Sequence, residues 1–449
     1  MSSPRSPRIF LDGYNLALEQ GTGVATYARN LSFGLRDLGA EVGVLYGTVN
    51  STISLQSLIR EIGFFDPMVG RPGKWMRIAK NVQRALTTPF GEIATQVPMT
   101  GRVVQETYRS RLPYFDSIWN VQRLFDSQRM HYSLYRTRLQ VYFRKPPQIM
   151  HWTYPLALKV TGAKNIYTMH DLVPLRLPYT TLDNKRLYFS LARQLGRRAD
   201  HIITVSEASK KDIVNLLGVK EERVTNTYQA VDIPTKYRNK PMSDVATEIE
   251  GTFGLKPGRY FLFVGAIEPK KNIGRMIEAY LASGVTDPLV IVGKRAWKSG
   301  QELRLISDNA HVRYLLTHDG ITETRYRVQQ IDYASFPLLV SLMRGAKALL
   351  FPSLYEGFGL PALEAMLLGT PVMTSNTASM PEVVGDAAMQ VDPYDTHAMA
   401  EAIRALDTDQ GLRDRLSAVG PARAEMFSPD RYKLRLAEAY AKVGAKWQG

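Results

Sequence analysis

Hydrophobic positions along this chain fall into two alternating patterns. Short runs of β-branched and aromatic residues are followed by longer segments whose apolar positions recur at helical spacing. This alternation is typical of parallel sheets whose strands are joined by crossover helices. The strands expected in the first half are 8–12, 41–46, 149–152, 165–169, 201–205 and 223–227, and those in the second half are 260–264, 289–292, 312–316, 348–351, 371–374 and 388–391. The pattern predicts an α/β protein.

Between the two sets of strands, residues 233–258 are polar, contain proline and show no strand pattern, as expected of a linker. A chain of 449 residues is also long for a single hydrophobic core. We therefore expect two Rossmann-like domains that face each other across a cleft, the first at 1–235 and the second at 259–429. A last helical segment, 430–449, follows the second domain.

The composition is that of a globular protein, with 45% hydrophobic and 22% charged residues. No apolar run approaches the roughly 20 residues that span a bilayer, and the N-terminus lacks the apolar core of a signal peptide. The absence of cysteine rules out disulfides and thiolate metal sites. Together these features predict a cytoplasmic location.

Positive charge is concentrated in residues 66–147, which interrupt the alternation of strands and helices. This segment holds fourteen Lys or Arg residues against five Asp or Glu, an excess of nine charges out of the chain's net +15. Within it, 74–86 separates apolar from basic positions on a helix: Trp75, Ile78, Ala79, Val82 and Leu86 against Lys74, Arg77, Lys80 and Arg84. Such a helix either packs on its own domain with solvated charges or lies on an anionic membrane surface. No nucleic-acid-binding motif accompanies the charge, so we expect no nucleic acid partner.

The segment most informative about chemistry is 351–368, FPSLYEGFGLPALEAMLL. Glu356 lies in a short loop after an apolar strand, and Gly357 and Gly359 follow it directly. Glu364 lies on the helix that begins just beyond. Glycines allow backbone N–H groups to approach a ligand closely, and a helix N-terminus favours bound anions. A site for anions flanked by two hydroxyl-binding carboxylates is typical of a receptor for a phosphorylated sugar.

The two glutamates, separated by seven residues, resemble the signature of the retaining family-4 glycosyltransferases, which have the GT-B fold. Four further segments resemble motifs of that family, in the family's order: LDGYNLALEQGTGVATYARNL (11–31), TMHDLVP (168–174), ITVSEASKKDI (203–213) and VGAIEPKKN (264–272). The resemblance covers most of the chain, with 66–147 as the main exception. It implies that the second domain binds a nucleotide sugar and that 430–449 crosses back to pack on the first domain.

By this resemblance, Glu364 is the carboxylate that binds the ribose, since a carboxylate can accept hydrogen bonds from both hydroxyls of a vicinal diol. Glu356 contacts the donor sugar near the reacting carbon, and His170 lies on the cleft floor beside the sugar. Taken singly, each of these residues also suits a structural role in a loop, on a helix surface or at a strand end.

Two lysines are placed to neutralise the leaving diphosphate. Lys270 and Lys271 follow an expected buried strand and precede a helix, so both can reach an anion in the cleft. The family more often has arginine first, and Lys270 keeps the charge but lacks the bidentate guanidinium. The expected catalytic residues are His170, Lys271 and Glu356, and the expected substrate-binding residues are Gly21, Thr22, Gly23, Lys270, Lys271, Glu356, Gly357, Phe358, Gly359, Leu360 and Glu364.

The sequence predicts neither a metal nor a cofactor. The only Asp-x-Asp, Asp407 to Asp409, lies between helical segments, and we interpret it as a helix cap or surface loop. The turn at 21–23 lacks the spacing of a dinucleotide fingerprint, which argues against an NAD enzyme. By resemblance this turn lines the cleft near the donor phosphate or the acceptor. Asp171 is expected to cap the turn that follows it, and Ser206 to cap a helix rather than act as a nucleophile.

The sequence thus predicts a metal-independent, retaining hexosyltransferase. The pattern resembles transferases of mannose and other GDP-sugars in bacterial surface polysaccharide or O-antigen assembly, acting on a glycan or lipid-linked glycan at the inner face of the membrane. Two alternatives remain: a nucleotide-sugar isomerase of the same fold, and a non-catalytic scaffold that docks on membranes.

Overall fold

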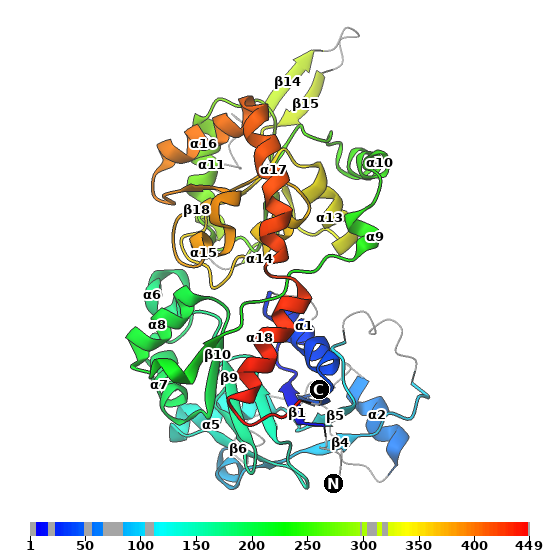
Figure 1. Ribbon diagram of the computed structural model, residues 1–449, viewed down its shortest axis with the longest axis vertical. Helices are drawn as coiled ribbons and strands as arrows, with labels where there is room; N and C mark the ends of the chain where they lie inside the picture. The colour runs from blue at the N-terminus through cyan, green and yellow to red at the C-terminus, as the bar shows by residue number, and fades with distance from the viewer. Residues whose placement is uncertain are drawn as a thin grey trace, which may run out of the picture.

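The computed structural model describes residues 6–16, 23–48, 56–65, 84–103, 112–296, 299–302, 312–316 and 322–447. Its helices and strands form two α/β domains stacked along the long axis of the molecule (Figure 1). Gly21, Thr22 and all but the last three residues of the expected basic helix 74–86 lie outside the described residues. Among the residues that are described, no helix is both long and apolar enough to cross a membrane.

The first domain is built on an eight-stranded sheet with the order β11-β10-β9-β7-β1-β2-β5-β4. Neighbouring strands are parallel except β4 and β5, which are antiparallel. The strands are β1 (Arg8–Asp12), β2 (Glu41–Tyr46), β4 (Thr95–Val97), β5 (Ser117–Asn120), β7 (Ile149–Trp152), β9 (Lys164–Thr168), β10 (His201–Thr204) and β11 (Val224–Asn226). A smaller sheet, β3-β6-β8, joins β3 (Glu92–Ile93), β6 (Leu139–Tyr142) and β8 (Leu158–Val160).

Helices surround this sheet because their buried positions recur at helical spacing. They are α1 (Gly23–Asp37), α2 (Ser57–Phe65), α5 (Leu124–Tyr135), α6 (Val173–Arg176), α7 (Lys185–Arg198) and α8 (Glu207–Leu217), with the short 3₁₀ turns η1 (Thr88–Phe90), η2 (Pro178–Thr180) and η3 (Glu221–Arg223). The Ser206 side chain accepts a hydrogen bond from the Ser209 N–H and caps α8, which confirms its expected role.

The second domain is built on a six-stranded, fully parallel sheet with the order β16-β13-β12-β17-β18-β19. The strands are β12 (Phe261–Val264), β13 (Leu289–Val292), β16 (Val328–Ile331), β17 (Ala348–Phe351), β18 (Val372–Ser375) and β19 (Met389–Val391). Its helices are α9 (Thr235–Arg238), α10 (Met242–Phe253), α11 (Ile273–Ala282), α12 (Ser299–Glu302), α13 (Phe336–Gly345), α14 (Leu360–Leu367), α15 (Met380–Val384), α16 (Thr396–Thr408) and α17 (Gln410–Glu425), with the turns η4 (Pro269–Lys271) and η7 (Gly385–Ala387).

Three details differ from the sequence prediction. Segment 312–316 is a strand, β14 (Val312–Leu316), but it pairs antiparallel with β15 (Thr322–Tyr326) outside the parallel sheet. The sheet edge is β16 instead, whose sequence VQQI lacks a continuous apolar run because an edge strand is only partly buried. The expected linker is mostly helical: α10 buries Val245 and Ile249 and packs against α13. Finally, β4 and β5 from the basic segment extend the first sheet.

The last helix, α18 (Pro429–Ala441), packs against α1 of the first domain (Figure 1). A buried polar network joins the two: His151 Nδ1 contacts the Tyr440 hydroxyl, and its Nε2 lies 2.7 Å from the Thr168 hydroxyl. Thr168 also shares a 2.8 Å hydrogen bond with Tyr27. Burial lowers the pKa of His151 to about 3, so this imidazole is neutral and bridges hydroxyl groups. The chain end is thereby fixed to the first sheet.

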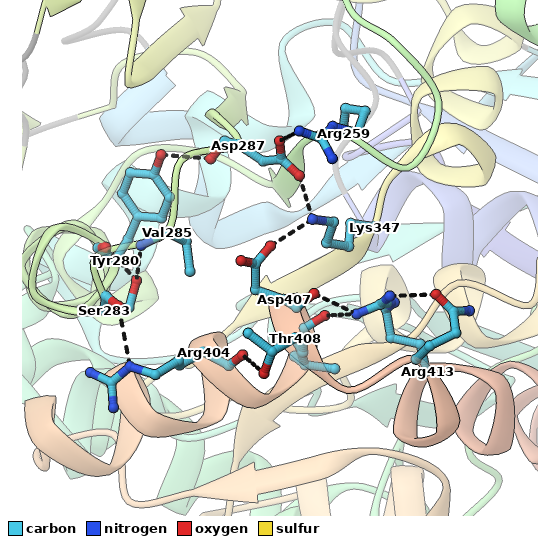
Figure 2. Close-up of polar contacts among 12 residues, drawn as sticks. Arg259, Tyr280, Ser283, Val285, Asp287, Lys347, Arg404, Asp407, Thr408 and Arg413 are labelled. Carbon is cyan, nitrogen blue, oxygen red and sulfur yellow. Dashed lines mark hydrogen bonds and ion pairs between the residues drawn. The ribbon is translucent and has the colours of Figure 1, made fainter.

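The Asp-x-Asp segment has a structural role (Figure 2). The Asp407 carboxylate forms an ion pair with Lys347, with Nζ and Oδ1 2.6 Å apart, and Lys347 also pairs with the buried Asp287. Asp409 accepts a hydrogen bond from the Leu412 N–H at 2.9 Å and caps α17. The expectation of a helix cap is confirmed, and one of the two carboxylates is held in an ion-pair network.

Candidate active site

The centre of the site is an ion pair at the carboxyl ends of β12 and β17. These strands are parallel neighbours, so the segments that follow them meet at one edge of the sheet. Lys271 ends the η4 turn after β12, and Glu356 lies in the loop after β17. The Lys271 Nζ lies 2.6 Å from Glu356 Oε1, with 11% and 9% of the two side chains exposed. Lys271 also lies 4.9 Å from the centre of the Phe351 ring.

Charges around this pair keep the Glu356 carboxylate ionised. Burial acts to raise the pKa of Glu356, but Lys271 and Lys270 outweigh it and hold that pKa below its usual value. For Lys270, burial acts to lower the pKa, and the carboxylates of Glu356, Asp171 and Glu268 together raise it above the usual value. The cluster therefore combines an ionised carboxylate with two lysines, and the raised pKa keeps Lys270 in its charged ammonium form at physiological pH.

His170 follows β9 in the first domain, and its backbone carbonyl lies against Gly357, the residue after Glu356. Its Nε2 lies 3.0 Å from the Thr153 carbonyl, which can only accept, so Nε2 carries the proton. Burial lowers the pKa of His170, with smaller opposing effects from that carbonyl and from Asp171. The imidazole is therefore neutral, with Nδ1 left as an acceptor. Asp171 caps the next turn through a 3.0 Å hydrogen bond from the Val173 N–H, as expected.

The two domains touch where Gly357 meets His170. A Cβ atom added to Gly357 would lie 2.6 Å from the His170 carbonyl oxygen and 3.3 Å from Asp171 Cβ. The same carbonyl accepts a 2.9 Å hydrogen bond from the Ser209 hydroxyl of α8. Only glycine fits this contact, so the residue after Glu356 is fixed by the approach of the first domain.

Glu364 lies on α14, whose N-cap is Gly359 with φ of +99°. This backbone conformation favours glycine, and a Cβ there would also displace the end of the Met380 side chain, whose sulfur would lie 2.6 Å away. Burial raises the pKa of the half-buried Glu364 to about 7. Among the described residues its carboxylate has neither a hydrogen-bond nor an ion-pair partner, so it is available to a ligand.

The remaining expected site residues differ in their surroundings. Phe358 is buried and packs against Phe427 and Tyr228, with ring centres 5.5 and 6.2 Å apart. Its side chain thus supports the domain boundary, and only its backbone can reach a ligand. Leu360 begins α14 and is half-buried, and Gly23 begins α1 in the first domain.

Sequence reasoning missed the residues that join the domains. Glu382 of α15 accepts hydrogen bonds from the Glu207 and Ala208 N–H groups, both at 2.9 Å, and so caps α8 from across the boundary. The Tyr355 hydroxyl donates to Asp212, which also accepts from Arg176 at 2.9 Å. No local motif marks the contacts of Glu382 and Tyr355 with the first domain, because each joins residues more than 140 positions apart.

One further residue, Asn272, shapes the lysine turn. It adopts a left-handed conformation (φ of +60°), and its side-chain amide donates to the carbonyls of Pro352 and Pro393 at 3.1 and 2.6 Å. It thereby ties the η4 turn to the loop that carries Glu356. Within the described part of the chain, no three His, Asp or Glu side chains gather as metal ligands.

Comparison with known proteins identifies the family. The family model of group 1 glycosyl transferases matches residues 247–423, and that of glycosyltransferase family 4 matches residues 100–234. The O-antigen chain mannosyltransferase B of Escherichia coli is 30% identical over 280 residues, which cover 61% of this chain and 69% of that protein. The serotype-specific mannosyltransferase WbdA of E. coli is 27% identical over 271 residues, covering 59% of this chain but only 32% of WbdA.

Among solved structures, sucrose-phosphate synthase from Thermosynechococcus elongatus superimposes with a TM-score of 0.64 at 17% identity, over 98% of this chain and 99% of that one. This likeness confirms the expected GT-B fold with its two α/β domains. The sequence matches extend the assignment from fold to family. The chain belongs to the family-4 glycosyltransferases.

Proposed function

We propose that this protein is a retaining, metal-independent hexosyltransferase of bacterial surface polysaccharide assembly. Its first candidate donor is GDP-mannose, with other GDP-sugars next, and its acceptor is a glycan or lipid-linked glycan. The second domain (259–429) would hold the nucleotide sugar, and the first (1–235, with 430–449 packed on it) would present the acceptor. The relatives named as an O-antigen chain mannosyltransferase and a serotype-specific mannosyltransferase support this choice of sugar and pathway class.

The observation that carries the proposal is the cluster of Lys270, Lys271 and Glu356, beside the contact of Gly357 with the His170 carbonyl across the domain boundary. Two charged ammonium groups can neutralise the diphosphate as it leaves, without a metal ion. Glu364, unpartnered among the described residues, would accept hydrogen bonds from the two ribose hydroxyls. Glu356 and the free Nδ1 of His170 would hold the hydroxyls of the donor sugar.

In this scheme the bond between the anomeric carbon and the diphosphate oxygen breaks first, and charge builds up on the diphosphate beside the two lysines. The acceptor hydroxyl then attacks the anomeric carbon from the side that the diphosphate leaves. Its proton passes to the leaving phosphate oxygen. Retention follows because attack and departure share one face, and Glu356 serves as a partner of Lys271 rather than as a nucleophile.

The proposal is tested by nucleotide binding and transfer in the presence of EDTA. We expect GDP to raise the melting temperature more than UDP or ADP, and we expect labelled mannose to pass from GDP-mannose to a lipid-linked glycan despite the chelator. Activity that disappears in EDTA and returns with Mg²⁺ or Mn²⁺ would refute the metal-independent site. Epimerised or isomerised nucleotide sugar as the product would favour the isomerase, and an inert protein would favour the scaffold.

The expected location is the cytoplasm, with peripheral association at the inner face of the cell membrane. A lipid-linked acceptor would require this, because both the nucleotide sugar and the growing glycan must reach one cleft. The sequence motivates the association through 74–86, of which only the last three residues are described.

A further inference from the structure

The small sheet β3-β6-β8 has one buried and one exposed face at the far end of the first domain from the second (Figure 1). Residues alternate along β6, so that Leu139 and Val141 are buried while Gln140 and Tyr142 are exposed. Ile93 of β3 pairs with Tyr142, and Lys159 of β8 pairs with Gln140. We call the surface formed by these exposed side chains and their neighbours the end face.

One side of the end face is apolar. Phe90 is 83% exposed, Ile93 72% and Leu86 67%, all within eight positions. The turn between Phe90 and Ile93 is fixed: Gly91 has φ of +84°, and a Cβ there would lie 2.5 Å from the Tyr142 ring. Large exposed apolar side chains so close together in the sequence are typical of an interaction surface.

The other side of the end face is basic. A surface pocket of about 600 Å³ is lined by Arg138, Lys159, Lys164 and Arg198, and the single acid in its lining, Asp200, is paired with Lys164 at 3.0 Å. Gly162, also in the lining, lies against Pro146, which follows two more exposed basic residues, Arg144 and Lys145. The pocket therefore presents an excess of positive charge. One of its residues, Lys159, pairs on the end face with Gln140, which lies two residues along β6 from the Tyr142 that pairs with Ile93.

We propose that the end face docks the protein on an anionic phospholipid bilayer. Leu86, Phe90 and Ile93 would enter the boundary between headgroups and acyl chains, and the basic pocket would lie on lipid phosphates. This pairing of apolar and cationic groups matches a lipid surface, which offers both environments within a few ångströms. A soluble anion would use the pocket without the apolar side chains, and an apolar protein partner would not need the pocket.

This inference deepens the membrane association of the proposed function, but it rests on residues outside the catalytic cluster, so a failure of docking and a failure of catalysis can be told apart. Docking through the end of the first domain leaves the second domain and the domain boundary unobstructed (Figure 1). It also assigns the membrane contact to residues outside the basic helix expected at 74–86, sharing only Leu86 with it.

The test is co-sedimentation of the full chain with vesicles of phosphatidylglycerol mixed with phosphatidylcholine, and of phosphatidylcholine alone. An apolar variant carries Leu86→Ser, Phe90→Ser and Ile93→Ser, and a charge variant carries Lys145→Gln, Lys159→Gln and Arg198→Gln. A control variant with the same loss of charge on exposed residues elsewhere carries Lys236→Gln, Lys256→Gln and Arg415→Gln. Melting temperatures check that all variants are folded.

We expect the wild type and the control to bind the anionic vesicles and not phosphatidylcholine alone, with binding weakened by salt. Each end-face variant should lose about 10²-fold in affinity, since three basic or three apolar anchors are removed. Donor hydrolysis by these variants should stay at the wild-type level, which separates docking from catalysis. End-face variants that bind the anionic vesicles like the wild type would overturn the proposal. So would wild-type protein that binds soluble glycerol phosphate, or phosphatidylcholine vesicles, as tightly as it binds the anionic vesicles.

Discussion

Replacing Gly357 with alanine should disrupt catalysis while leaving the fold intact. The added Cβ would lie 2.6 Å from the His170 carbonyl oxygen and 3.2 Å from its carbon. Ordinary contacts begin near 3.4 Å, so the domain boundary must open by roughly 0.8 Å to admit the methyl group. The contact belongs to backbone on both sides, so no flexible side chain can move to relieve it.

This displacement separates Glu356 and Lys271 on the second domain from His170 on the first. A misplacement of about 1 Å can cost about 10²-fold in rate, so kcat/KM for sugar transfer should fall by about that factor. The melting temperature should change little, because the methyl group lies between the domains rather than inside either core. Steady-state transfer assays and thermal melts measure the two effects separately.

Gly251→Ala provides the matched control. This glycine lies in α10 of the same domain, and a Cβ there meets nothing within 4 Å, so alanine should preserve activity and favour the helix slightly. A folded Gly357→Ala variant with wild-type kcat/KM would refute the reasoning, because it would mean that the contact with His170 has no part in turnover.

Four further predictions address the roles of single side chains. Lys271→Ala should lower kcat by roughly 10²-fold or more, since it removes charge that stabilises the leaving diphosphate, with Lys236→Ala as the control; wild-type turnover in the folded variant would contradict this role. Glu364→Gln should flatten the pH dependence of GDP binding measured by calorimetry. Burial raises the pKa of Glu364 to about 7, so the wild type loses its ionised hydrogen-bond acceptor as the pH falls through 7. For folding of the ligand-free protein the sign is opposite, because a carboxylate with a raised pKa costs stability as the pH rises from about 4.5 to 7. The Gln variant should therefore gain stability relative to the wild type above pH 7. Parallel pH profiles of GDP binding in the two proteins would argue against the ribose role. Lys347→Ala should reduce the free energy of unfolding by about 3 kcal/mol, because it leaves buried Asp287 and half-buried Asp407 without their shared cation. Asp407→Asn should keep full turnover in EDTA. If the wild type instead needs Mg²⁺ or Mn²⁺ and the variant loses that activity, the Asp-x-Asp is a metal site.

Most parallel strands of both sheets could be predicted from the sequence because they are buried on both faces. Leu289–Val292 and Ala348–Phe351 are continuous apolar runs, and each is buried along its full length. Strands with one exposed side lack that pattern. The edge strand β16 (VQQI) was missed for this reason, and β14 was placed in the wrong sheet because a strand's sequence does not specify its partner.

The candidate site divides in the same way. Glu356, Glu364 and the lysine turn follow strand ends within single motifs, so spacing and resemblance identified them as candidates. The contacts of Gly357 with His170, Glu382 with α8 and Tyr355 with Asp212 depend on how two separately folded sheets meet. The hydrophobic pattern within each domain does not predict how the two domains pack against each other. These residues come together only in the folded molecule.

The central claim is metal-independent sugar transfer with retention at a site built from Lys270, Lys271, Glu356 and His170. Proton NMR of GDP-mannose incubated with the protein in EDTA tests it directly, even without an acceptor, because slow hydrolysis reports the stereochemistry. We predict that α-mannose forms first and converts to the β-anomer only by mutarotation. Lys271→Ala should reduce the rate at which GDP-mannose is hydrolysed. Release of β-mannose first, or cleavage that requires added Mg²⁺ or Mn²⁺, would contradict the account.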